Sequence, residues 1–304
     1  MKTIRTILFG LLTLNSLAQE QVNYKIVVDE PRKINNFSCN IDLLHMDGGV
    51  SNIDGFSFNS GVWGHAMYKQ RMGLDYTFRY GILTFGKFAS ANAKNHINIQ
   101  TGGFFIFHQN DPIGTNRIAL KSEGGGTTSD GRAITINTYL TVPSRKWKYK
   151  AVRGGIYFNR SGVSIDNPLG KDNYYNYYML GAYGGICFGS ARHVEIQTDK
   201  YGAKGVVSHV RICLDALITP ISNKPTSVKN AIPVGGRLLV QALPSLRKKD
   251  RKGKLRTAMT AEFEVGYRMV DGIYIGGTLS IPISRSLKVL MAKEEDQTPK
   301  RTTE

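Results

Sequence analysis

The chain has 304 residues and a formal net charge of +17, with 33 glycines, 15 tyrosines and 13 phenylalanines. After the first 18 residues no segment approaches the length of about 18 uncharged apolar residues that a membrane-spanning helix needs. This excludes a protein that crosses a membrane through helices. Abundant aromatic residues and glycines suit strands joined by tight turns.

Residues 1–18 have the pattern of a secretory signal peptide, with a basic start, an apolar run and small residues before a cleavage site. The residues that carry it are Lys2, Arg5, the run Ile7–Leu14, Ser16 and Ala18. We predict cleavage between Ala18 and Gln19, which removes two positive charges and lowers +17 to +15. An exported chain without a spanning helix is either a soluble protein or a β-barrel.

Strict alternation of apolar and polar residues recurs along the mature chain and predicts strands, because successive side chains of a strand point to opposite faces. A hairpin over 257–283, with a tight turn at Val270–Gly272, shows it most plainly. Further strands are predicted over Cys39–Met46, Gly61–Lys69, Gly73–Phe85, Asn95–His108, Arg117–Lys121, Arg132–Val142, Lys146–Asn159, Tyr174–Gly189, Arg192–Thr198, Val206–Thr219 and Val234–Leu243.

The predicted fold class is all-β, an antiparallel transmembrane up-and-down β-barrel of about 12 strands, with a range of about 10–14. Residues 19–36 are predicted as a polar periplasmic lead-in, 37–292 as the barrel and 293–304 as a polar disordered tail. Short turns are predicted at 70–72, 143–145, 190–191 and 270–272. This spacing leaves the strand parity open, and a further strand at Ser286–Met291 would make the count 14.

The structural alternative is an exported soluble β-sandwich, whose apolar face would form a core. Nearly every long strand has an apolar face, and together these faces hold more apolar side chains than the core of one sandwich of this size needs. The opposite faces carry sparse charges of both signs. These two features favour a membrane barrel with a polar lumen.

The chain resembles the uncharacterised outer-membrane β-barrel proteins of the Bacteroidota. The resemblance rests on the signal-peptide ending Ser16–Gln19, on alternating strands of about 10 residues and on the hairpin near the C-terminus. It implies an outer-membrane location in a Gram-negative bacterium and carries no site. One departure is the charged tail after Ile283, where such barrels often finish on an aromatic residue.

The polar strand faces suggest a lumen-wide charge network as the candidate site. Its predicted members are Asp75, Arg79, Arg211, Asp215, Arg237, Glu262, Glu264 and Arg268. Glu262 and Glu264 share one face and formally allow a carboxylate dyad, but ion pairing with arginines on neighbouring strands is favoured.

No catalytic, cofactor-binding or metal site is predicted, and the chain is not expected to be an enzyme. Ser208 and His209 are neighbours in the sequence, so they point to opposite faces and cannot act as a pair. The odd set Cys39, Cys187 and Cys213 has no metal-type spacing, and three small buried thiols are favoured over a disulfide.

The expected partners follow from location and charge. Outer-membrane lipid contacts the barrel, and lipopolysaccharide phosphates are a candidate partner for the basic segment Arg247–Arg256. No aromatic residues interleave with that segment, and no nucleic-acid partner is expected. An envelope protein is a further candidate partner.

Two functions remain open from the sequence. The first is a pore-like barrel that passes small solutes, leaning toward anions because the chain is basic. The alternative is a non-conducting barrel whose lumen is filled by the charge network and which serves as a structural or partner-complex subunit of the cell envelope.

Overall fold

The structure of the chain is a computed structural model that describes residues 22–32, 37–49, 55–86, 96–165, 173–223, 232–245 and 259–283. The thirteen regular elements of this part of the chain are all strands. Within the same residues, no helix is long and apolar enough to cross a membrane. The predicted signal peptide, the segment Arg247–Arg256, the candidate strand Ser286–Met291 and the tail lie outside the described residues.

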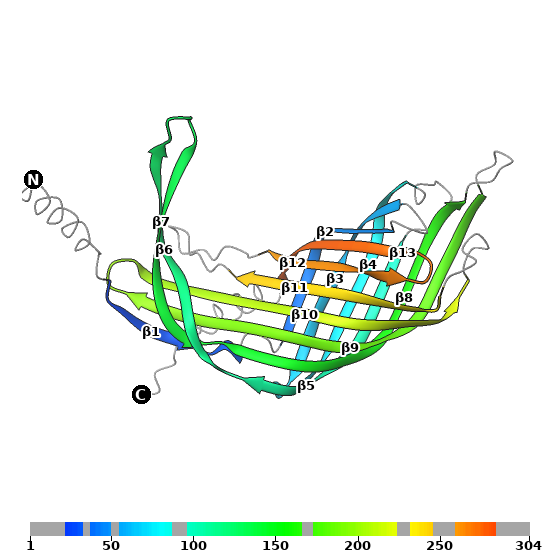
Figure 1. Cartoon of the computed structure of the whole chain (residues 1–304), viewed down its shortest axis with the longest axis horizontal. Coiled ribbons are helices and arrows are strands. Elements are labelled where there is room, and N and C mark those ends of the chain that lie inside the picture. The colour runs from blue at the N-terminus through cyan, green and yellow to red at the C-terminus, as the bar shows by residue number, and fades with distance from the viewer. Residues whose placement is uncertain are drawn as a thin grey trace, which may run out of the picture.

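Ten antiparallel strands form a closed barrel (Figure 1). Around the wall they follow the order β9-β10-β11-β12-β13-β2-β3-β4-β5-β8, and the ring closes where β8 pairs with β9. Their bounds are β2 Phe37–Gly49, β3 Gly55–Tyr68, β4 Met72–Gly86, β5 Ile97–Asn110, β8 Trp147–Ile165, β9 Asn173–Thr198, β10 Gly202–Ser222, β11 Val234–Ser245, β12 Thr260–Arg268 and β13 Gly272–Pro282.

The wall therefore has ten strands rather than about twelve. Three strands lie outside it: β1 (Tyr24–Asp29) pairs with β9 alone, and β6 (Ile113–Thr127) and β7 (Ala133–Arg145) form a separate hairpin. The segment 190–191 is not a turn, because β9 runs through it to Thr198 and turns only at 199–201. Ten is an even number, which removes the parity problem.

Alternation along the wall strands separates a polar interior from an apolar exterior. On β10, Arg211, Cys213 and Asp215 are buried inside, whereas Ile212 and Leu214 between them are 41% and 49% exposed on the outer face. The same pattern runs along β13, where Ile273, Ile275 and Leu279 are exposed and the residues between them are buried or half-buried. A soluble sandwich would bury these apolar side chains in a core. In this barrel they lie on the outer surface, and the polar side chains lie inside.

One end of the barrel carries a second structural unit, which we call the extension. At the end where β2 begins and β13 ends, β9 and β10 continue past the first residue of β8, Trp147, which pairs with Ala191. Beyond that point β1 pairs with the vacated edge of β9, from Thr198 to Val194. The β6–β7 hairpin inserts between β5 and β8 at this same end (Figure 1).

The extension has a small apolar core of its own. The base of the hairpin packs on the outer face of β9 through Ile118, Leu120, Val142, Val194 and Ile196, all buried. On that face of β9, Phe188 is 42% exposed but Val194, further along the strand, is 0% exposed. Protein therefore covers the apolar face of β9 beyond Ala191, while the same face stays open along the barrel.

Candidate functional site: the lumen

The lumen is crossed by ion pairs between strands that face each other. Arg211 of β10 donates hydrogen bonds to both carboxylate oxygens of Asp75 on β4, one of them at 2.9 Å. Arg79 of β4 donates to Oε1 of Glu262 on β12 at 2.7 Å. Each pair joins strands four places apart in the ring of ten. Because strands so far apart lie on nearly opposite sides, both pairs bridge the interior.

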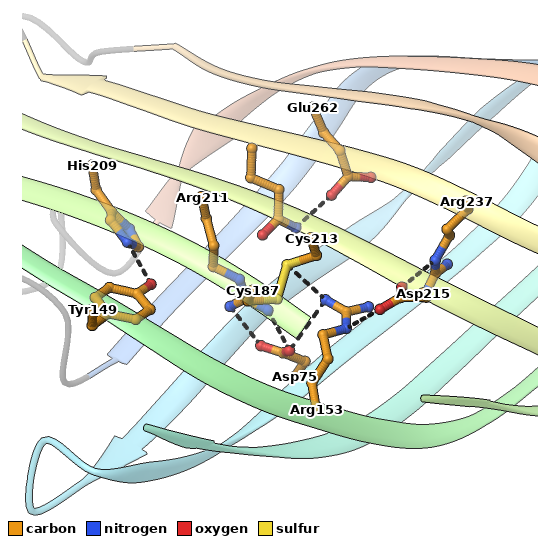
Figure 2. The surroundings of a disulfide bond; sticks show 11 residues. Asp75, Tyr149, Arg153, Cys187, His209, Arg211, Cys213, Asp215, Arg237 and Glu262 are labelled. Carbon is orange, nitrogen blue, oxygen red and sulfur yellow. Dashed lines mark hydrogen bonds and ion pairs between the residues drawn. A yellow bond between two sulfur atoms is a disulfide. The ribbon is translucent and has the colours of Figure 1, made fainter. Parts of the chain in front are cut away.

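A third bridge runs through Arg237 of β11, whose contact with Asp215 is shown in Figure 2. Its Nε donates to Asp215 Oδ2 at 2.6 Å, and its Nη1 donates to Gln100 of β5 at 2.6 Å, across the lumen. Arg153 of β8 approaches the other Asp215 oxygen, with Nε 3.1 Å from Oδ1. Two arginines thus share one fully buried carboxylate.

Arg268 organises the barrel end opposite the extension. Its guanidinium lies 2.9 Å from Asp47 Oδ2, 3.3 Å from Glu264 Oε1 and 3.4 Å from Asp271 Oδ2. The Tyr274 ring lies 3.5 Å from the Arg268 Cζ, and its hydroxyl donates to Glu264. This cluster ties β2, β12 and β13 together where the 269–271 turn closes the hairpin.

The described interior is close to neutral, with a small acidic excess. Five buried arginines face six buried carboxylates and the half-buried Asp75, a difference of two negative charges when histidines are neutral. The arginines are Arg79, Arg153, Arg211, Arg237 and Arg268, and the carboxylates are Asp42, Asp47, Asp75, Asp215, Glu262, Glu264 and Asp271. The strongly positive charge of the whole chain therefore does not come from these lumen residues.

One small cavity lies between these side chains. The central cavity, lined by Asp75, Arg79, Gln100, Arg211 and Glu262 among others, has a volume of about 20 Å³. A water molecule needs about 10–15 Å³ measured in this way. The cavity therefore has room for one or two water molecules.

A disulfide stands in the wall beside this network (Figure 2). Cys187 of β9 and Cys213 of β10 are directly paired in the register and form an S–S bond that faces the lumen. The expectation of three buried thiols is wrong for this pair. The pairing follows from the true turn, because Cys187 and Cys213 lie thirteen residues on either side of Lys200.

All eight residues of the predicted network are placed in the interior. Asp75, Arg79, Arg211, Asp215, Arg237, Glu262, Glu264 and Arg268 each take part in at least one ion pair there. Sequence reasoning missed four further members: Asp42, Asp47, Arg153 and Asp271. Arg153 was detectable, since it alternates with the inward residues Ala151 and Tyr157 on one strand. Asp42 was detectable too, since it alternates with the buried residues Ser38 and Asn40, but Asp47 was not, because β2 changes register between Ile41 and His45.

Four histidines are buried in the described interior, and two of them, His65 and His209, lie nearer the extension. His65 Nδ1 is 2.9 Å from Ser38 Oγ, and His209 Nε2 is 2.9 Å from the Tyr149 hydroxyl. Ser208 and His209 point to opposite faces of β10, His209 being buried inside. Among the described residues no group of three or more His, Cys, Asp or Glu side chains is placed to hold a metal ion.

With this geometry in hand, comparison with known proteins gives no relative. No family model, no curated protein and no solved structure matches the chain.

Proposed function

We propose that this protein is a non-conducting outer-membrane β-barrel that anchors the extension at one surface of the membrane and serves as a structural subunit of the cell envelope. One observation carries the proposal: buried ion pairs, Arg211 with Asp75 and Arg79 with Glu262, span the lumen between opposite strands. In this proposal the ion-paired side chains fill the lumen, so no open channel runs through the barrel.

Insertion in a membrane is supported by the exterior. Wall strands expose large apolar side chains on their outer faces, among them Leu74, Ile156, Leu214 and Ile273. A soluble protein that exposed such a continuous apolar band would associate or precipitate, whereas lipid solvates it. The location in the outer membrane rests in addition on the signal-peptide pattern of residues 1–18.

Closure of the lumen is supported by the energetics of buried charges. Opening a path would separate guanidinium and carboxylate groups such as those of Arg237 and Asp215, and leaving a buried charge without its partner costs about 3–5 kcal/mol. Several such pairs share partners, so they would have to open together. A channel would need a wider gap beside Asp75, Arg79 and Glu262 than the cavity of about 20 Å³ that these residues line.

The extension is the part of the protein that the filled barrel would anchor at the membrane. It consists of β1, the β6–β7 hairpin and the ends of β9 and β10, which continue out of the wall without a break. A barrel that conducts nothing but fixes a folded unit at a membrane surface fits a role in supporting an envelope complex. Lipid is the partner of the barrel exterior, and the extension is the part available to protein partners.

Solute uptake by proteoliposomes tests the proposal. The purified protein, reconstituted in liposomes, is expected to leave swelling in isotonic arabinose at the rate of empty liposomes, with a known porin as the positive control. On gels, the unboiled protein is expected to migrate differently from the boiled protein, as folded barrels do. Swelling above the empty-liposome rate would support the passive channel instead, and unchanged migration on boiling would argue against the membrane barrel.

A further inference from the structure

The β6–β7 hairpin has buried side chains at its base and exposed side chains at its tip. Ile118, Leu120 and Val142 are buried in the core of the extension. From Lys121 to Tyr139 almost every residue is exposed, and Ile134, Ile136 and Tyr139 are among the exposed large apolar side chains. Figure 1 shows this part of the hairpin standing away from β9 and β10, across their direction.

The tip lacks the third strand that would stabilise it. Within the described residues, β6 and β7 pair only with each other. A two-stranded hairpin alone is marginally stable in water, and its outer edges present unpaired N–H and C=O groups. An added strand would pair with the N–H and C=O groups of one edge, and its side chains would lie beside Ile134 and Ile136, which share one face.

The two edges of the tip differ in how they are protected. β6 carries Arg117, Lys121 and Glu123 and then the run Gly124–Gly126, features that weaken strand addition. The segment Ala133–Val142 of β7, AITINTYLTV, has no charge and no proline, and it is rich in β-branched residues. The edge of β7 is therefore the one suited to receive another strand.

We propose that this edge binds the same edge of a second copy of the chain, so that two β7 strands pair antiparallel about a two-fold axis. Self-pairing brings each residue opposite another of the same segment, and an uncharged segment can do so without placing like charges together. The alternation is kept, so Ile134 and Ile136 of both copies share one face of a four-stranded sheet. A hairpin that stands away from its barrel can reach a neighbour in the same membrane.

The interface is tested by the mass of the full chain in detergent micelles and nanodiscs, measured by light scattering. The wild-type protein is expected at twice the mass of one chain. The variant with Ile134→Lys and Ile136→Lys is expected at the mass of one chain, because four lysines would then meet across the two-fold axis. Ser122→Lys is the control: it adds one lysine per chain to β6, directly opposite Asn137, and is expected to leave the dimer intact.

Cross-linking gives a second measurement that does not depend on hydrophobic side chains. Single cysteines placed from Thr135 to Tyr139 in a Cys39→Ser background are expected to form an intermolecular disulfide at one of these positions, and Ser122→Cys is expected to form none. A wild-type monomer at every concentration, or a dimer that survives the double lysine variant, would overturn the proposal. So would a monomer that captures a different envelope protein through β7. None of these outcomes depends on whether the lumen conducts.

Discussion

Arg211 and Asp75 meet in the middle of the barrel through two parallel hydrogen bonds, although their strands lie four places apart around the wall. Arginine suits this position because its planar guanidinium matches the two oxygens of a carboxylate. Two further contacts support the pair. The Arg211 guanidinium lies over the Phe104 ring, and the Arg153 guanidinium lies 3.6 Å from Asp75. One bidentate pair thus fixes the distance between two opposite sides of the barrel.

Removing one partner of this pair is expected to destabilise the barrel. Asp75→Ala leaves the Arg211 guanidinium, which is 4% exposed, without its main partner, and the expected loss is about 3–5 kcal/mol. Urea-induced unfolding in lipid vesicles, followed by the gel shift on boiling, measures it. Asp130→Ala removes one partner of an exposed pair with Arg132 and is the control, with an expected loss of about 0–1 kcal/mol. Equal losses for the two variants would show that the lumen pair contributes little.

The Cys187–Cys213 disulfide makes a prediction about thiol number. The unfolded but unreduced protein is expected to react with one equivalent of an alkylating reagent, at Cys39, and with three after reduction. Because both sulfurs are buried, reductant is expected to act on the protein in urea and not on the folded barrel. Three reactive thiols without reduction would contradict the disulfide.

Loss of this disulfide is expected to lower stability without changing the fold. Replacing Cys187 and Cys213 together by serine opens a covalent loop whose ends are 26 residues apart, which is expected to cost about 2–4 kcal/mol. The urea midpoint measures the change, and Cys39→Ser is the control. A double variant as stable as the control would mean that the strand pairing of β9 and β10 already holds the loop closed.

The position of the lipid can be read by tryptophan fluorescence. The two native tryptophans, Trp63 and Trp147, are buried, so lipids brominated on their chains are expected to leave wild-type fluorescence almost unchanged. Leu214→Trp, on the exposed outer face of β10, is expected to be quenched strongly. Ile136→Trp on the hairpin tip is expected to escape quenching. Equal quenching of the two introduced tryptophans would contradict the proposed position of the membrane around the barrel.

The parts of the fold that depend on alternation were predictable from the sequence. The hairpin of β12 and β13 and the strand β10 have regular periods of two, and one buried face repeats along each. The eight predicted lumen residues come from such stretches. A period of two decides which way a side chain points, but it does not say which strands are neighbours.

What could not be predicted depends on pairing between strands. Arg132–Val142 reads as a strand, yet it pairs with β6 outside the wall, because the core around Val142 and Val194 is formed only in three dimensions. Predicting the disulfide requires the position of the turn between β9 and β10, at 199–201. The small residues Ser190 and Ala191 instead indicate a turn at 190–191. Bulges, as between Ile41 and His45, reverse the faces of a strand, and this one conceals Asp47.

Single-channel recording in planar bilayers tests the central claim of a filled lumen most directly. The wild-type protein is expected to insert and give no conductance steps. A variant with Asp75, Arg79, Arg211 and Glu262 all replaced by serine removes both partners of the two cross-lumen pairs, leaves fewer buried charges unpaired than single changes would, and is expected to give clear steps. Conductance steps from the wild-type protein would contradict the account.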